Sequence, residues 1–329
     1  MRRRNFLALP IPAALLLNSD VTRAYAAPLV KLRISATSRL TMCPFYTAYE
    51  SGYFADAGLD IELVKDMGTA QSLPLLAGGK IDGTLSSFGP PVVNAIVRGA
   101  RVRVVAGREV ISSACGTAGT IFVSVKRFPH GIQTMRQLKG ARIALSQSPQ
   151  TTFWFDVLIQ AEGMRDNDFQ TTKMREGERV LALRAGGIDA YVSSDADFST
   201  EARDLGVSSG PRVSSLLPNY QFSHIMFGRT LLDGPVDTGA RFLRAYFRGA
   251  SEFLQGKTPK FMDEYAQKND LDPKLLREGC RGTFERDGTI HMKDLQLYTD
   301  WMGANALAPA HVNAADLVDN RFLEAARRP

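Results

Sequence analysis

The chain has 329 residues, of which 44% are hydrophobic and 22% are charged. This composition excludes a disordered or fibrous chain. The length allows one large domain or two lobes with buried cores.

Residues 1–26 have the three-part pattern of a secretory signal peptide. A basic start at Arg2–Arg4 precedes an apolar run from Phe6 to Leu17, and Ala24–Ala26 (Ala-Tyr-Ala) supplies the small residues of a cleavage site. The apolar run is too short to anchor the chain in a bilayer. We therefore expect cleavage near Ala26 and a soluble, periplasmic mature protein.

The route of export is left open by the same residues. Arg3–Leu7 reads Arg-Arg-Asn-Phe-Leu and matches the twin-arginine pattern, but an ordinary secretory signal can also carry three arginines. Without residues 1–26 the chain has 36 basic and 33 acidic residues, a net charge of +3. Such a balance gives no reason to expect a nucleic-acid partner.

Two segments of the chain repeat the same order of features. LLAGGKIDGTLSSFG (75–89) and LRAGGIDAYVSSDAD (183–197) each show a helix end, a glycine stop, an Ile-Asp strand start and a Ser-Ser exit. Upstream, residues 32–64 and 141–174 each read as strand, polar loop, helix and strand. Alternating strands and helices predict parallel sheets, and the repeat predicts two α/β lobes.

The predicted strands end in hydroxyl-rich loops. These loops are Thr37-Ser38, Ser86-Ser87, Ser146-Gln147-Ser148 and Ser193-Ser194. Ligands of open parallel sheets bind beyond the carboxyl ends of the strands, so a site between the lobes is expected. The alternative is that these side chains only cap the helices that follow.

Two extended connections are expected to link the lobes. Residues 102–125 leave the first lobe and residues 216–234 return to it. The predicted lobes are 27–112 with 222–329, and 113–221. Such a two-stranded hinge permits closure around a ligand.

The patterns in the rest of the chain indicate residues with a structural role. Beyond the return, apolar residues such as Phe242, Leu243 and Tyr246 have the spacing of a helix that packs on the core. Cys43, Cys115 and Cys280 are expected to be buried, and no disulfide is predicted.

Four stretches carry a family resemblance. They are PFYTAYESGYFADAGLDIELV (44–64), residues 75–107, residues 135–164 and ALRAGGIDAYVSSDAD (182–197). They resemble the periplasmic substrate-binding proteins of ABC importers, in the group that binds nitrate, sulfonates, taurine and thiamine-pyrimidine precursors. The resemblance covers the chain beyond the signal peptide.

The resemblance implies a fold and a function. The expected fold is the α/β, two-lobe periplasmic-binding-protein fold of type II, with parallel-rich sheets flanked by helices, a ligand cleft and a two-stranded hinge. The expected function is capture of a small organic solute by lobe closure and delivery to the permease subunits of an ABC transporter. A monomer without metal or cofactor is expected.

Two departures from the family pattern bear on the solute. The loop at 146–152 lacks the glycines that bring backbone close to a tetrahedral anion. Asp195-Ala196-Asp197 stands where many relatives have Glu-Pro. Two carboxylates near the cleft would favour a cationic or hydrogen-bond-donating solute, unless both face solvent or cap a helix.

The candidate ligand-binding residues come from both lobes and from the return connection. Pro44 suits a first helical turn, and Phe88 with Trp154 could cover a flat ring, which favours an aromatic or heterocyclic solute over an inorganic anion. Trp154 could instead pack on the sheet, and His224 could be structural. The candidates are Thr37, Ser38, Pro44, Phe45, Ser86, Ser87, Phe88, Gly89, Ser148, Thr151, Thr152, Trp154, Ser194, Asp195 and His224.

Two other functions share the expected fold. The fungal thiamine-pyrimidine synthases are enzymes with a cysteine-rich iron motif, and this sequence has neither that motif nor a G-x-S-x-G or phosphate-loop signature. A ligand-sensing subunit of a membrane receptor would have the same cleft. A binding protein without catalytic residues is the preferred interpretation.

Overall fold

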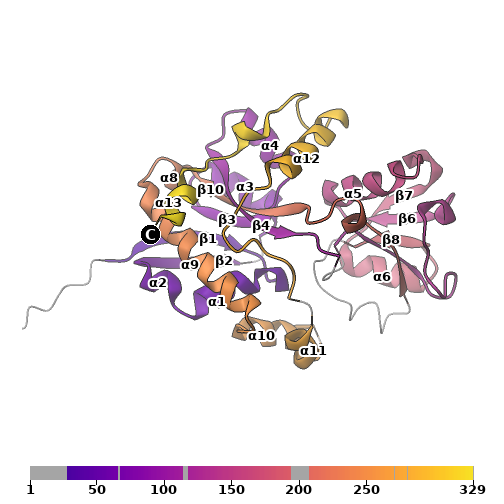
Figure 1. The fold of residues 1–329 in the computed structure, drawn as a ribbon, viewed down its shortest axis with the longest axis horizontal. Helices are drawn as coiled ribbons and strands as arrows, with labels where there is room; N and C mark the ends of the chain where they lie inside the picture. The colour runs from indigo at the N-terminus through magenta and orange to yellow at the C-terminus, as the bar shows by residue number, and fades with distance from the viewer. Residues whose placement is uncertain are drawn as a thin grey trace, which may run out of the picture.

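The computed structural model describes residues 28–65, 67–113, 118–193, 207–269, 271–279 and 281–328. These residues form two five-stranded mixed sheets flanked by helices (Figure 1). The predicted signal peptide and cysteines 115 and 280 lie outside the described residues, whereas Cys43 is described and fully buried.

The first sheet, sheet A, has the strand order β2-β1-β3-β10-β4. Strands β1, β2 and β3 are parallel, and β10 is antiparallel to both of its neighbours. The strands are β1 (Val30–Ala36), β2 (Leu59–Lys65), β3 (Gly83–Ser87), β4 (Val102–Val110) and β10 (Gln221–Gly228). The helices of this part are α1 (Cys43–Glu50), α2 (Tyr53–Asp56), α3 (Thr69–Ala77), α4 (Pro90–Val97), α8 (Arg229–Leu232) and α9 (Val236–Leu254).

The second sheet, sheet B, has the strand order β7-β6-β8-β5-β9. Strands β6, β7 and β8 are parallel, and β5 is antiparallel to β8 and β9. The strands are β5 (Thr120–Ser124), β6 (Arg142–Leu145), β7 (Gln170–Lys173), β8 (Ala190–Val192) and β9 (Val207–Arg212), and the helices are α5 (Pro149–Gln160) and α6 (Glu176–Arg184).

The repeat predicted from the sequence appears as two equivalent halves. The unit β1-α1-β2-α3-β3 gives the local order β2-β1-β3, and β6-α5-β7-α6-β8 gives β7-β6-β8. The two-lobe α/β fold is therefore confirmed. The sheets are mixed rather than purely parallel because β5 and β10, the strands that enter each lobe from the other, run against their neighbours.

The two connections between the sheets run side by side. The Ile111 amide donates to the Tyr220 carbonyl at 2.8 Å, and the Val213 amide donates to the Gly119 carbonyl at 3.0 Å. The lobe boundary predicted near residue 112 falls in the first connection and the one near residue 222 falls at the start of β10. Both boundaries stay a prediction.

The C-terminal helices pack on the helices and strands around sheet A, and one of them also reaches α5 (Figure 1). The indole Nε1 of Trp301 on α12 donates to Asp156 Oδ2 on α5 at 2.8 Å. The rings of Tyr298 and Phe153 lie 5.0 Å apart beside this bond. The helices are α10 (Lys260–Lys268), α11 (Pro273–Glu278), α12 (Met292–Ala304) and α13 (Arg321–Arg327). Within the described ranges, no helix combines the length and apolar character needed to cross a membrane.

Helix α9 carries the apolar stripe predicted from the sequence. Phe242, Leu243 and Tyr246 are buried in the core of sheet A. Helix α1 packs closely against the same helix, because a side chain at Gly249 would lie 2.5 Å from Ala48 Cβ and 2.6 Å from its backbone nitrogen. The first helix after β1 is therefore held against the lobe by a backbone-to-backbone contact.

We expect the Gly249→Ala substitution to destabilise the protein by about 1–3 kcal/mol, because its methyl group meets the Ala48 backbone and no side-chain rotation can relieve the overlap. Urea denaturation measures this change. The control is Gly187→Ala, where the nearest atom to the new Cβ is the Ala182 oxygen at 3.4 Å. Equal unfolding midpoints for the two variants would contradict the close packing.

Candidate functional site

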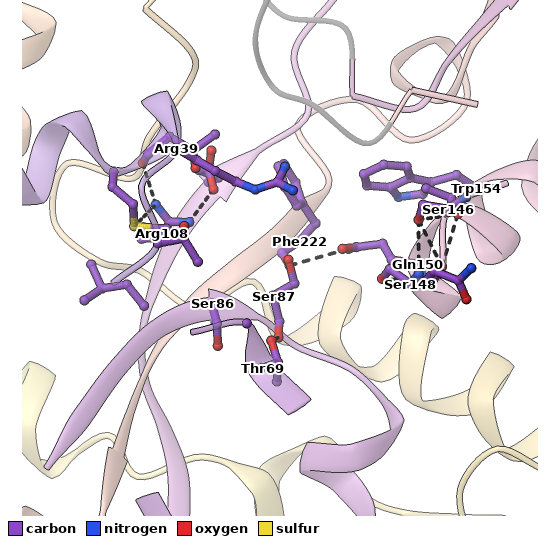
Figure 2. A pocket seen from close by; sticks show the side chains of 18 of the residues that line it. Arg39, Thr69, Ser86, Ser87, Arg108, Ser146, Ser148, Gln150, Trp154 and Phe222 are labelled. Carbon is purple, nitrogen blue, oxygen red and sulfur yellow. Dashed lines mark hydrogen bonds and ion pairs between the residues drawn. The ribbon is translucent and has the colours of Figure 1, made fainter. Parts of the chain in front are cut away.

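A cavity of about 450 Å³ is lined by residues from both sheets (Figure 2). This volume is in the range of pockets that hold small organic molecules. The sheet A side contributes Thr37, Arg39, Thr41, Met42, Gly68, Thr69, Leu85, Ser86, Ser87, Arg108, Glu109 and Phe222. The sheet B side contributes Ser146, Gln147, Ser148, Gln150, Thr151, Trp154, Met174, Arg175 and Arg179.

Six of the residues predicted from the sequence line this cavity. They come from the loop after β1, from the end of β3 and from the loop and helix after β6, so the equivalent strand ends of the two lobes face each other. The six are Thr37, Ser86, Ser87, Ser148, Thr151 and Trp154.

Other candidates lie elsewhere. Ser38, Pro44, Gly89 and Thr152 do not line the cavity, and Ser194 and Asp195 lie outside the described residues. Phe45, Phe88 and His224 are buried and are also absent from the lining.

The structure does not bring Phe88 and Trp154 together around the cavity. The Phe88 ring packs edge-on against His224 at 5.8 Å, whereas the Trp154 ring packs edge-on against Phe222 at 5.6 Å. The neighbouring Phe155 packs against Phe169 within sheet B's core. Trp154 thus both packs on its surroundings and reaches the cavity wall.

Pro44 lies in the first turn of α1, as its position after a polar loop indicated. Its side chain is buried and the residues just before it, Thr41 and Met42, line the cavity instead. The start of α3 lies there too, because Gly68 caps this helix and Thr69 Oγ1 donates to the Ser87 carbonyl at 3.3 Å.

The hydroxyls of the loop before α5 bond to one another. Ser146 Oγ and Thr151 Oγ1 are 2.9 Å apart, and the Ser148 amide donates to Ser146 Oγ at 3.1 Å. Ser148 also caps α5, since its Oγ accepts from the Gln150 amide at 3.3 Å. Capping and a place in the cavity wall therefore coexist in this loop.

The charged residues of the site were not predicted. Arg108 and Glu109 are 2% and 3% exposed, and Arg108 Nη2 donates to Glu109 Oε2 at 2.5 Å. Arg39 and Arg175 are exposed at the cavity, and Arg179 is buried with Nη1 donating to the Val192 carbonyl. The available signal was the adjacent charged pair at 108–109 inside the largely apolar strand VRVVAGREV.

The state of Glu109 follows from its surroundings. Burial raises the pKa of its carboxyl, and the positive charge of Arg108 opposes that shift. Because Arg108 donates directly to the carboxylate, the pair is held as an ion pair inside the protein.

Several polar atoms of the lining are buried without a hydrogen-bond partner in the described part of the chain. Among them are Thr37 Oγ1, Ser86 Oγ, Glu109 Oε1 and Trp154 Nε1. Buried polar atoms are normally paired, so these atoms have unused hydrogen-bonding capacity at the cavity wall. Among the described residues, no group of three or more His, Cys, Asp or Glu side chains could hold a metal ion.

His224 lies behind the cavity on β10, paired in register with Ser86 of β3. Burial is the main cause that lowers the pKa of its imidazole to about 3, and the positive charge of Arg108 adds to it. His224 is therefore a neutral, buried side chain at neutral pH.

Comparison with solved structures shows which class this fold belongs to. The periplasmic aliphatic sulphonate binding protein SsuA from Escherichia coli matches with a TM-score of 0.70 and 17% identity, over 88% of this chain and 92% of that chain. The alkanesulfonate-binding protein SsuA from Xanthomonas axonopodis pv. citri, bound to MOPS, matches with a TM-score of 0.66 and 18% identity, over 90% and 100%. The fold is that of the periplasmic binding proteins.

A family model assigns the chain more narrowly. The model described as NMT1/THI5 like matches residues 40–255, so the chain belongs to the NMT1/THI5-like family. The same fold also occurs in an enzyme, because the desulfurization enzyme DSZB matches with a TM-score of 0.58 and 15% identity, over 90% of this chain and 98% of that chain. No curated protein matches significantly.

We expect His224 to make the protein less stable in mild acid. Its folded pKa of about 3 lies below the unfolded value of 6.5, so the unfolded chain binds more protons and stability falls as the pH drops below about 6.5. The loss between pH 7 and pH 5 is about 2 kcal/mol.

Urea denaturation at both pH values measures this loss. His224→Gln should remove that part of the pH dependence, whereas His130→Gln, which changes an exposed side chain, should behave like the unchanged protein. The same slope in all three proteins would show that His224 does not titrate on unfolding.

Proposed function

We propose that this protein is an extracytoplasmic solute-binding protein that captures a small organic acid between its lobes and delivers it to an ABC permease. The observation that carries the proposal is the cavity of about 450 Å³ whose polar wall comes from both sheets. The NMT1/THI5-like family assignment and the fold of the sulfonate-binding relatives support it.

The charges at the cavity favour an acidic group on the solute. Four arginines line it, of which Arg39 and Arg175 are exposed and come from opposite sides, while Glu109 is the one carboxylate in the described lining. The starts of α3 and α5 lie at the cavity on opposite sides, and helix N-termini favour negative charge. The aspartates at 195 and 197, which suggested a cationic solute, lie outside the described residues.

The size and the apolar part of the wall favour an organic solute over a bare inorganic anion. Leu85, Trp154, Met174 and Phe222 line the cavity beside the charges. These side chains can cover a hydrocarbon or ring once water is displaced. The aromatic or heterocyclic solute expected from the sequence stays the preferred class, and the arginines add an acidic group to it.

The connections between the sheets support capture by lobe closure. Two adjacent backbone segments, near Ile111 and near Tyr220, join the lobes and can act as a hinge. Residues 27–112 with 222–329 and residues 113–221 are the proposed rigid bodies. Export under the signal at residues 1–26, by the general or the twin-arginine route, and action as a monomer complete the proposal.

The enzyme alternative is weaker because of the composition of the wall. The described lining contains neither a cysteine nor a histidine, and its single carboxylate is paired with Arg108. The hydroxyls of Ser146 and Thr151 bond to each other, and the residues that the structure describes in the lining offer no histidine or unpaired carboxylate as their general base. The fold itself does not distinguish a binding protein from an enzyme, since one fold can host unrelated functions.

A thermal-shift screen of residues 27–329 tests the proposal. The panel holds aromatic and heterocyclic carboxylates and sulfonates, each beside a neutral relative of the same shape, with inorganic nitrate and sulfate. A ligand at a hundredfold excess over its Kd adds about 2.7 kcal/mol, which raises Tm by several degrees. Acids should raise Tm and neutral relatives should not; equal effects of both would contradict the proposal.

We expect Arg39→Gln and Arg175→Gln each to weaken binding of the best acid about tenfold, because each removes a positive charge at the cavity. Isothermal titration calorimetry measures the change. The matched control is Arg165→Gln, since Arg165, like Arg175, precedes a helical turn but lies outside the lining. An equal loss in the control would point to a general effect of charge.

Mass spectrometry of the recovered ligand separates binding from catalysis. A binding protein returns the acid unchanged after prolonged incubation. A product of altered mass would favour the enzyme alternative.

A further inference from the structure

Glu109 contributes a carboxylate to the cavity wall, and only one of its two oxygens accepts a hydrogen bond within the described chain. Glu109 Oε2 accepts from Arg108 at 2.5 Å, and its Oε1 is buried without a hydrogen-bond partner in the described chain. Glu109 is only 3% exposed and lines the cavity. A buried acceptor in that state is unfavourable unless something donates to it.

Arg108 serves to hold this carboxylate and not the solute. Its Nε donates to Ser223 Oγ at 2.9 Å, its Nη1 donates to the Thr41 carbonyl at 2.6 Å, and its Nη2 donates to Glu109. All three nitrogens of the guanidinium therefore have protein acceptors. The arrangement fixes the Glu109 side chain from one side and leaves Oε1 for a donor from elsewhere.

The opposite wall carries the complementary group. Trp154 Nε1 on α5 is a donor, is buried and has no partner among the described residues. Figure 2 shows Trp154 across the cavity from Arg108, the residue that holds Glu109. A solute that satisfies both walls must offer a donor to Glu109 and an acceptor to Trp154.

We propose that Glu109 is a specificity-determining residue that accepts a hydrogen bond from an N–H or O–H group of the solute. The site then takes organic acids that also carry an amino, amide or hydroxyl donor, and discriminates against acids without one. This inference rests on the proposed function, since it adds a second recognition element to an acid-binding site.

The substitution Glu109→Gln replaces the hydrogen-bond acceptor that faces the cavity by a donor. Arg108 has only donors, so the amide oxygen of the new side chain must face Arg108 and its NH₂ group must face the cavity. A donor then stands where an acceptor stood, and the side chain keeps its size. The matched control is Glu285→Gln, because Glu285 accepts from His291 Nε2 at 2.9 Å and lies outside the lining.

The test is calorimetric titration with matched probes: benzoate against the three aminobenzoates and three hydroxybenzoates, and benzenesulfonate against its amino derivatives. We expect the unchanged protein to bind at least one donor-bearing probe about tenfold or more tightly than its parent acid. Glu109→Gln should lose this preference and Glu285→Gln should keep it.

The other outcomes overturn the inference in distinguishable ways. Equal binding of parent and donor-bearing acids by the unchanged protein leaves the proposed function standing and refutes the role of Glu109. An equal loss for all probes in Glu109→Gln shows that Glu109 only supports Arg108. No binding of any probe counts against both the inference and the proposed acid-binding function.

Discussion

The buried ion pair of Arg108 and Glu109 connects several segments of the chain that are far apart in the sequence. Its backbone belongs to β4, where the Arg108 carbonyl accepts from the Glu285 amide at 2.8 Å and so ties the C-terminal segment to sheet A. The Arg108 side chain reaches β10 through Ser223 and the segment just before α1 through Thr41. Removing either partner would leave an uncompensated charge in the core, so the surrounding elements depend on the pair.

The order of the strands explains why residues of both lobes line the cavity. Strand β10 returns from the second lobe between β3 and β4, which places Phe222 at the cavity and lets Gln150 Nε2 of α5 donate to its carbonyl at 3.4 Å. On the outer side, Trp301 of α12 donates to Asp156 of the same helix. Helix α5 is therefore held to the first lobe at two places.

Much of the fold could be predicted from the sequence, and less of the site. The Gly-Gly-Ile-Asp repeat and the alternation of strands and helices predicted both lobes, because parallel βαβ units have few possible arrangements. The hydroxyl loops were predicted at the strand ends, and Ser86, Ser148 and Thr151 lie at the cavity. Phe45 and Phe88 were expected there too, but spacing alone does not tell a cavity wall from a core, and both are buried.

Arg108 and Glu109 could not be predicted as site residues, because no feature of the neighbouring sequence indicates that this pair faces a cavity. On a strand, neighbouring side chains point to opposite faces, so a direct contact between them requires the irregular pairing of β4 with β10. A buried ion pair is also a poor source of stability, since apolar residues of the same volume would often serve as well. Its presence in the buried part of β4 is therefore better explained by what Glu109 can accept than by what the pair contributes to folding.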